Sequence, residues 1–126
     1  MAEGRRRFVV VLWAAGPGRP GLAAAPFVYA LAARALDADV EIHYTADCVR
    51  WLVPGVADAA CTDAARTRTV LDLIRETKAA GVRHYACTMA LAEHAPGAAL
   101  IAEADGRAGA ATLVGGALDG AVTLVF

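Results

Sequence analysis

The sequence lacks an excess of charge of either sign, and it lacks a long apolar run. Its 126 residues include 12 basic and 13 acidic side chains, for a formal net charge of −1. A nucleic-acid-binding domain normally shows a clear basic excess, so this balance argues against a nucleic-acid partner. No apolar run reaches the roughly 18–20 residues that span a bilayer. The longest are Phe8–Ala15 and Leu22–Ala33, and we therefore expect no membrane partner.

Cysteine is also scarce, and its three copies, Cys48, Cys61 and Cys87, follow no repeated spacing. An odd number of cysteines does not form a disulfide framework. No Cys-x-x-Cys pair and no Cys/His cluster with the spacing of metal ligands occurs in the sequence. We therefore expect no zinc site and no cofactor, and a reducing, cytoplasmic setting.

Apolar residues are abundant, at 58% of the chain. This value excludes a disordered chain and allows a well-filled core. It also predicts that sister subunits cover part of an apolar surface. The length fits one domain over residues 1–126, with residues 1–6 expected to be a disordered tail.

The N-terminal segment allows two interpretations. Arg5, Arg6 and Arg7 followed by the apolar run from Phe8 to Trp13 imitate a secretory signal, even a twin-arginine one. The same residues fit a first β-strand behind a polar tail. We favour the strand, because the run is short for an export signal and rich in β-branched residues. Cleavage would also remove what looks like the central strand.

Strands and helices alternate along the sequence. The apolar and alternating patterns predict strands over Arg7–Ala14, Val40–Tyr44, Val82–Cys87, Gly106–Ala111 and Ala121–Phe126. Helices are expected over Pro26–Leu36, Asp47–Val53 and Ala111–Leu118, from Val70 to a stop at Gly81, and as short pieces within Ala90–Ala104. This order predicts parallel βαβ units, and hence a three-layer α/β/α sandwich with a mostly parallel sheet of about five strands.

Cys87 is the best candidate for a reactive atom, because it ends a predicted parallel strand. Ligands of open α/β sheets bind in the crevice outside those strand ends. If a helix begins at Thr88 or Met89, its free N–H groups would favour the thiolate over the thiol. A thiolate is the form that attacks a persulfide or disulfide sulfur. The alternative is a packing role, because free cysteine is among the most buried residue types.

The other candidate side chains have weaker positions. Cys48 is either a resolving thiol for Cys87 or a small side chain on a short helix. His84 precedes Cys87 by three residues, so the two side chains face opposite sides of the strand. His43 lies on the wetter face of its strand, whereas His94 follows Cys87 and is the one histidine placed to reach it. A plain surface histidine is the alternative for His94.

Four segments of the sequence are similar to the DsrE/DsrF-like family, which includes small sulfur-relay and peroxiredoxin-like proteins. They are Pro26–Leu36, Val40–Val49 with Leu52–Val56, Tyr85–Leu91, and Ala108–Thr112 with Val122–Phe126. The third, Tyr-Ala-Cys-Thr-Met-Ala-Leu, resembles the family's Ala-Cys-Ser-x-x-Met segment, with Thr88 where serine is common. The resemblance implies a Rossmann-like fold, assembly into dimers, trimers or hexamers, and a Cys87 that carries sulfur as a persulfide.

Two functions follow from these features. In the first, the protein is a sulfur carrier or sulfurtransferase, in which Cys87 takes sulfane sulfur from a donor protein and passes it to an acceptor. Thr45, Asp47, Thr88 and His94 would then form the binding pocket. In the second, the protein is a non-catalytic, oligomeric module that binds a small ligand at the strand ends, and Cys87 only lines its pocket.

Overall fold

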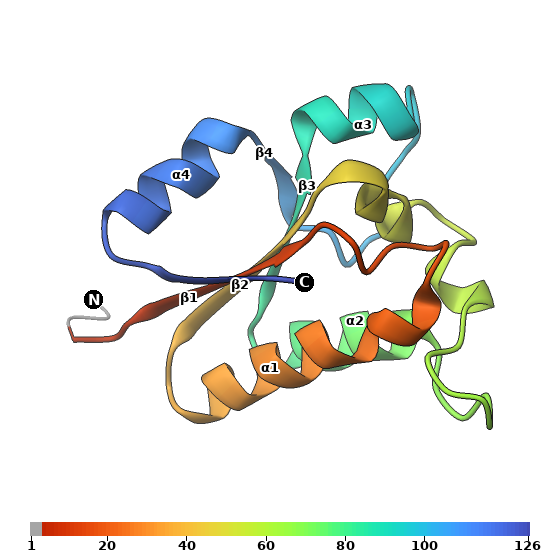
Figure 1. Ribbon diagram of the computed structural model, residues 1–126, viewed down its shortest axis with the longest axis horizontal. Coiled ribbons are helices and arrows are strands. Elements are labelled where there is room, and N and C mark those ends of the chain that lie inside the picture. The colour runs from red at the N-terminus through yellow and green to blue at the C-terminus, as the bar shows by residue number, and fades with distance from the viewer. Residues whose placement is uncertain (1–3) are drawn as a thin grey trace.

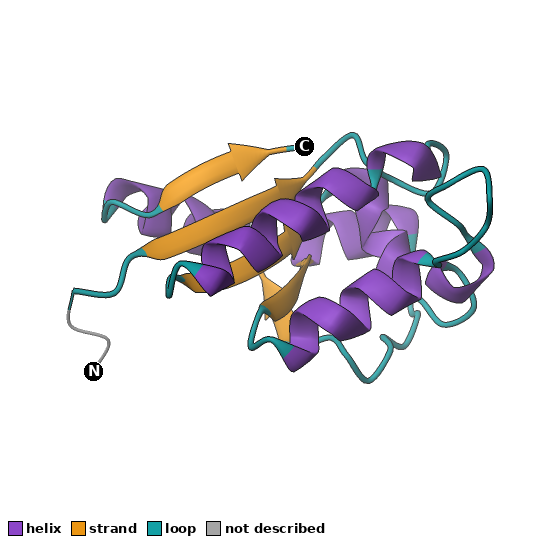
Figure 2. Ribbon diagram, turned by 90° about the horizontal axis from the view of Figure 1, so that it is seen from below, coloured by secondary structure: helices purple, strands orange, loops and turns teal. Residues whose placement is uncertain are grey.

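The computed structural model describes residues 4–126, and its centre is a five-stranded parallel sheet with the order β4-β3-β2-β1-β5 (Figure 1). The strands are β1 (Arg7–Leu12), β2 (Asp39–Tyr44), β3 (Arg83–Cys87), β4 (Gly106–Ala108) and β5 (Val122–Val125). All five predicted strands are therefore present, and Figure 2 shows the long strands running in one direction.

Helices lie on both sides of the sheet. The four α-helices are α1 (Ala24–Ala35), α2 (Val70–Ala79), α3 (Thr88–His94) and α4 (Ala110–Leu118). Short 3-10 helices cover η1 (Pro20–Leu22), η2 (Ala46–Leu52) and η3 (Ala57–Ala59). Helices α1 and α2 cover one face, while α4 lies on the other (Figure 1). This arrangement confirms the predicted α/β/α architecture. Within residues 4–126, no helix combines the length and the apolar character needed to cross a bilayer.

The position of β1 differs from the prediction in one respect. Strand β1 lies between β2 and β5, so the central strand is β2 and the expectation that β1 is central is wrong. Both faces of β1 are nevertheless buried: Val10 and Leu12 belong to the main core, and Val9 and Val11 are buried on the opposite face. This two-sided burial explains its continuous apolar run.

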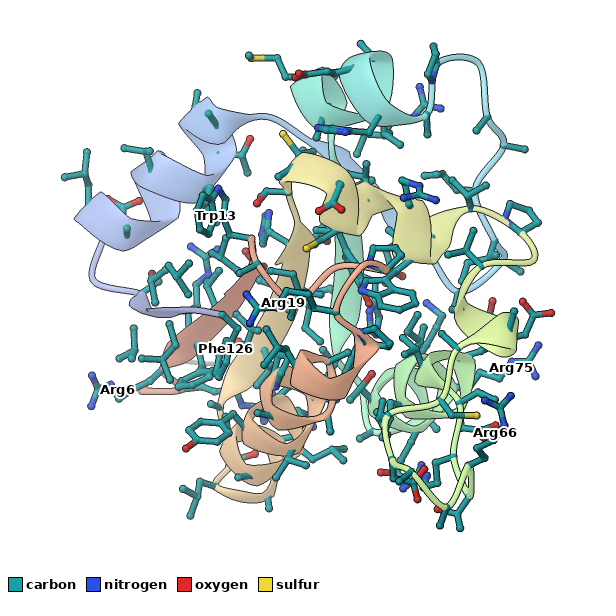
Figure 3. The ribbon with its side chains drawn as sticks, turned by 45° about the vertical axis from the view of Figure 1, so that its right-hand side comes forward. Arg6, Trp13, Arg19, Arg66, Arg75 and Phe126 are labelled. Atoms are coloured by element: carbon teal, nitrogen blue, oxygen red, sulfur yellow. The ribbon has the colours of Figure 1, made fainter. Side chains whose placement is uncertain are left out.

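Both ends of the described part of the chain, residues 4–126, have contacts with the sheet. The expected disordered tail over residues 1–6 includes residues 1–3, which lie outside the described residues. Of the rest, Arg5 forms ion pairs with Asp37 and Asp39, and the Arg6 carbonyl accepts the Asp39 N–H at 2.8 Å. At the other end, the Trp13 and Ala14 N–H groups donate to the Phe126 carbonyl at 2.7 and 2.9 Å (Figure 3).

Helix α2 shows how local sequence determines an element. Thr69 and Asp72 form a capping box, in which each side chain accepts the backbone N–H of the other residue, at 3.0 and 2.9 Å. The helix stops before Gly81, whose φ of 96° is a conformation that glycine adopts without a steric penalty. This confirms the predicted stop at Gly81.

A buried polar network lies inside the main core on the α1–α2 side of the sheet. The His84 ring is fully buried, with Nδ1 2.8 Å from the Tyr44 hydroxyl and Nε2 3.1 Å from Thr77 Oγ1. Burial lowers the pKa of His84 from 6.5 to about 4, and it raises the pKa of Tyr44 well above 10. At neutral pH, His84 is therefore an uncharged structural residue.

This network predicts acid sensitivity. In the unfolded chain His84 binds a proton below about pH 6.5, whereas in the folded chain it does so only near pH 4. Protonation therefore favours the unfolded state, and the free energy of unfolding falls as the pH decreases from 6.5 to 4. The lowered pKa of about 4 corresponds to roughly 3 kcal/mol of stability lost at the acidic end. Urea denaturation across this window measures the loss. NMR titration of His84 with an ordinary value of 6.5 would contradict the prediction.

Candidate functional site

Cys87 lies where four strands end. It is the last residue of β3 and the N-cap of α3, which begins at the next residue without an intervening loop. Its backbone has φ −66° and ψ 124°, still extended, while its side chain is half-buried. Strands β1, β2 and β4 end at the same edge, so Cys87 occupies the place where ligands of parallel sheets bind.

A pocket of about 320 Å³ opens beside Cys87. Strand β2 and the segment after it, helix α3, and the start of α4 supply its walls, which are mainly apolar. The lining residues are His43, Thr45, Ala46, Cys87, Met89, Ala90, Glu93, Ala108, Gly109, Ala110 and Leu113. Cys87 therefore lines a small cavity while it also packs against the hydrophobic core.

The predicted site residues separate into two groups. Thr45 lines the pocket with Cys87, and its Oγ1 donates to the Leu12 carbonyl at 2.7 Å. Asp47 is not among the lining residues: it lies in η2 against Gly16, where an added Cβ would be 2.6 Å from Asp47 Oδ1. Thr88 and His94, the first and last residues of α3, are exposed and do not line the pocket either.

Two residues that the sequence analysis did not assign to the site lie at this pocket or directly behind it. His43, on β2, lines the pocket, and its Nε2 lies 3.0 Å from the Glu41 carboxylate. Both side chains are buried, with His43 4% and Glu41 6% exposed. The expectation that this face of β2 is the wetter one is therefore wrong. Helix α4 and the neighbouring strands exclude water from that face.

Glu41 is held from both sides. Arg7 of β1 donates to one carboxylate oxygen at 2.9 Å, and Arg83 of β3 donates to the other at 3.1 Å. The hydrogen bond from His43 is the largest cause that lowers the pKa of Glu41, and burial opposes it. Glu41 is therefore ionised at neutral pH. An ionised carboxylate only accepts hydrogen bonds, so the proton between the two residues is on His43 Nε2.

Helix α4 lies close to this cluster because of Gly116. A Cβ at Gly116 would be 3.0 Å from Arg7 Nη1 and 3.1 Å from Nη2. A side chain here would displace either the helix or the guanidinium. Glycine thus lets α4 pass over Arg7 while Arg7 reaches Glu41.

The alternation of β2 gave one signal for the missed pair, because Glu41 and His43 are two residues apart and share a face. The sequence does not reveal which residues of β3 lie beside them. In the structure, Glu41 pairs with Arg83 and His43 with Tyr85, which brings the end of β2 next to Cys87. The register between strands was therefore the missing information.

The other two cysteines have different surroundings. Cys48 is fully buried in η2, and burial raises the pKa of its thiol to about 12. It is therefore protonated at neutral pH and fits the packing role better than that of a resolving thiol. Cys61 is half-buried and pairs with Thr69 in an isolated antiparallel bridge, away from the pocket.

The part of the chain from residue 4 onward contains no group of three or more His, Cys, Asp or Glu side chains that could hold a metal ion. A larger cavity of about 860 Å³ lies at the opposite end of β1, between α1 and β5. Its lining includes Tyr29, Leu36 and Leu124 but neither cysteine nor histidine. We therefore place the candidate chemistry in the smaller pocket.

Comparison with known proteins identifies the family of the chain. The profile of the DsrE/DsrF-like family matches residues 8–126, which is nearly the whole chain. The chain belongs to the DsrE/DsrF-like family. This family is generally linked to sulfur relay. A search of curated proteins found no match to the sequence.

A solved structure shows the same fold. The crystal structure of the ychN protein from E. coli superposes with a TM-score of 0.74 and 14% sequence identity. The match covers 97% of this DsrE-like chain and 99% of the ychN chain. At this identity the likeness supports the fold alone, and the function has to be argued from the site.

Proposed function

We propose that this DsrE-like protein is a sulfur carrier that accepts sulfane sulfur on Cys87 and passes it to an acceptor protein. The observation that carries the proposal is the position of Cys87: it is half-buried, at the carboxyl edge of the sheet, and on the wall of a pocket of about 320 Å³. Family membership over residues 8–126 supports a role in sulfur chemistry.

The proposed reaction is one displacement at sulfur. The Cys87 thiolate attacks the terminal sulfur of a donor persulfide, R–S–SH, and forms a new S–S bond. The S–S bond of the donor breaks, and R–S⁻ leaves with the electron pair. The products are the Cys87 persulfide and the donor thiolate, with no net oxidation or reduction. A second displacement by an acceptor thiolate returns Cys87 to its thiolate.

The pocket suits a persulfide intermediate. Its walls include the apolar side chains of Met89, Ala108 and Leu113. It remains open enough for a donor's terminal sulfur to reach Sγ. The alternative, a module that binds a small ligand without chemistry, uses the same pocket but requires no sulfur on Cys87.

Intact mass spectrometry tests the proposal. The protein is incubated with glutathione persulfide and is expected to gain the mass of one sulfur atom, with peptide mapping locating it on Cys87. Dithiothreitol is expected to remove the added mass, because thiols reduce persulfides. An unchanged mass under conditions that load a known persulfide carrier would favour the binding module over the sulfur carrier.

We further propose that the protein assembles with copies of itself. Large apolar side chains are exposed on or next to two helices that cover the sheet: Val28, Tyr29 and Leu36 at α1, and Val114 and Leu118 on α4. Strand β5 pairs with β1 only, so its other edge is open among the described residues. Apolar surface and open edges of this kind are typical of subunit contacts.

Sedimentation equilibrium tests the assembly. We expect a mass that is a multiple of the 13.0 kDa chain, because burial of these side chains between subunits removes apolar surface from water. A Leu118→Glu variant, with a charge on α4, is expected to reduce the mass if α4 is in the interface. A single species of 13.0 kDa at micromolar concentrations would contradict the proposal.

A further inference from the structure

We propose that His43 is the acid–base group for sulfur transfer at Cys87 and that Glu41 is the residue that positions it. This inference rests on the proposed function, because it assigns a role in the same reaction. It extends that function by identifying a group in the pocket that accepts the proton of the Cys87 thiol before the thiolate attacks.

The geometry of His43 carries the inference. Its Nε2 is bound to Glu41 at 3.0 Å, while Nδ1 has no hydrogen-bond partner among residues 4–126. No side-chain nitrogen or oxygen that is fully buried in this part of the chain lacks a partner. Nδ1 therefore keeps some contact with solvent although the residue is only 4% exposed, and His43 lines the same pocket as Cys87.

Glu41 fixes the state of the imidazole. Because the carboxylate accepts the Nε2 proton, the neutral ring carries its free lone pair on Nδ1. When Nδ1 takes up a proton, the adjacent negative charge stabilises the imidazolium. This is the role of the orienting carboxylate in histidine-dependent nucleophilic enzymes. Arg7 and Arg83 keep Glu41 ionised and hold it in place.

The charged and titratable groups around His43 come from four elements. Besides Glu41 on its own strand, they are Arg7 on β1, Arg83, Tyr85 and Cys87 on β3, and Glu93 on α3. Helix α4 contributes no titratable side chain, since its sequence is AATLVGGAL. The Tyr85 ring lies 5.4 Å from the His43 ring, between centroids, and limits its movement.

His43 and Cys87 are not hydrogen-bonded to each other in the described structure, so the proton moves through the donor's sulfhydryl or a water in the pocket. The Cys87 S–H bond breaks and its proton reaches Nδ1. The thiolate forms the S–S bond with the terminal sulfur of R–S–SH, and R–S⁻ leaves. Protonated Nδ1 then donates to R–S⁻. The net products are the Cys87 persulfide and R–SH.

The test compares loading rates across pH. Glutathione persulfide is the donor, and His43→Gln, Glu41→Gln and the exposed-site control His94→Gln are measured by intact mass. At neutral pH His43→Gln is expected to load roughly 10²-fold more slowly, with His94→Gln unchanged. Glu41→Gln is expected to slow loading less. His43→Gln is also expected to change the shape of the pH–rate profile, because it removes the group proposed to accept the Cys87 proton.

Three further measurements separate the possible failures. Thermal melts show whether each variant folds, and added imidazole is expected to restore part of the rate to His43→Ala, which a purely structural role would not allow. Alkylation of Cys87 by iodoacetamide needs no sulfur donor and is expected to be slower in His43→Gln, with Cys61 unaffected. If the parent gains no sulfur but its Cys87 is still alkylated faster than that of His43→Gln, the carrier function fails while the role of His43 as proton acceptor for Cys87 stands. Equal rates and equal pH profiles in folded parent and His43→Gln would overturn the inference.

Discussion

A Cys87→Ala variant is expected to lose all of the sulfur gained by the parent from a persulfide donor. The reason is that neither remaining cysteine can substitute for it. Cys48 is fully buried with a pKa raised to about 12, so it supplies almost no thiolate at neutral pH. Cys61 is half-buried outside the pocket and lacks the surroundings of Cys87. Intact mass spectrometry after a fixed incubation measures the loss.

The matched control is Cys61→Ser. This variant removes the other accessible thiol from a bridge segment that has no contact with the pocket. It is expected to load sulfur as the parent does, while the double variant behaves like Cys87→Ala. Equal loading of the parent and Cys87→Ala would assign the reaction elsewhere and remove the basis for the proposed function. Loss of loading in Cys61→Ser alone would have the same consequence.

A Trp51→Ala variant is expected to lose roughly 3–5 kcal/mol of unfolding free energy. Trp51 is the largest fully buried side chain, and it ties η2 to the loop after β1. Its Nε1 donates to the Ala15 carbonyl at 2.7 Å. Truncation leaves a large cavity and a buried carbonyl without its partner. Urea denaturation at a fixed protein concentration measures the change.

The same amino acid on the surface provides the control. Trp13 is 64% exposed, next to the end of β1 (Figure 3). Trp13→Ala is expected to change the unfolding free energy of the isolated chain by no more than about 0.5 kcal/mol. Equal unfolding free energies of the two variants would contradict the burial of Trp51 in the core.

Much of the site was predictable, because it depends on local sequence. The apolar run of β1, the alternation of β2, and the glycine stop at Gly81 gave the order of strands and helices. In a parallel sheet that order places the end of every strand at one edge. Cys87 at the end of β3 and Thr45 just after β2 were therefore identifiable from the sequence, and both line the pocket.

The remaining predicted site residues depended on local geometry that the sequence does not specify. Asp47 follows Thr45 closely, yet the 3-10 turn of η2 directs it against Gly16. His94 was placed near Cys87 by its position in the chain. In helix α3, His94 instead lies about 100° around the helix axis from Glu93, and its side chain is exposed. Glu93, one residue earlier, lines the pocket instead.

The sequence by itself determined the parallel α/β architecture and the place of Cys87, because hydrophobic periodicity and glycine or proline stops act over a few residues. Only the tertiary structure decided which groups surround the thiol. The register of β2 against β3 sets His43 beside Tyr85 and Glu41 beside Arg83. Gly116 of α4 leaves room for the Arg7 guanidinium beneath the helix. Register and helix packing join residues that are distant in the chain, so no local pattern in one sequence contains them.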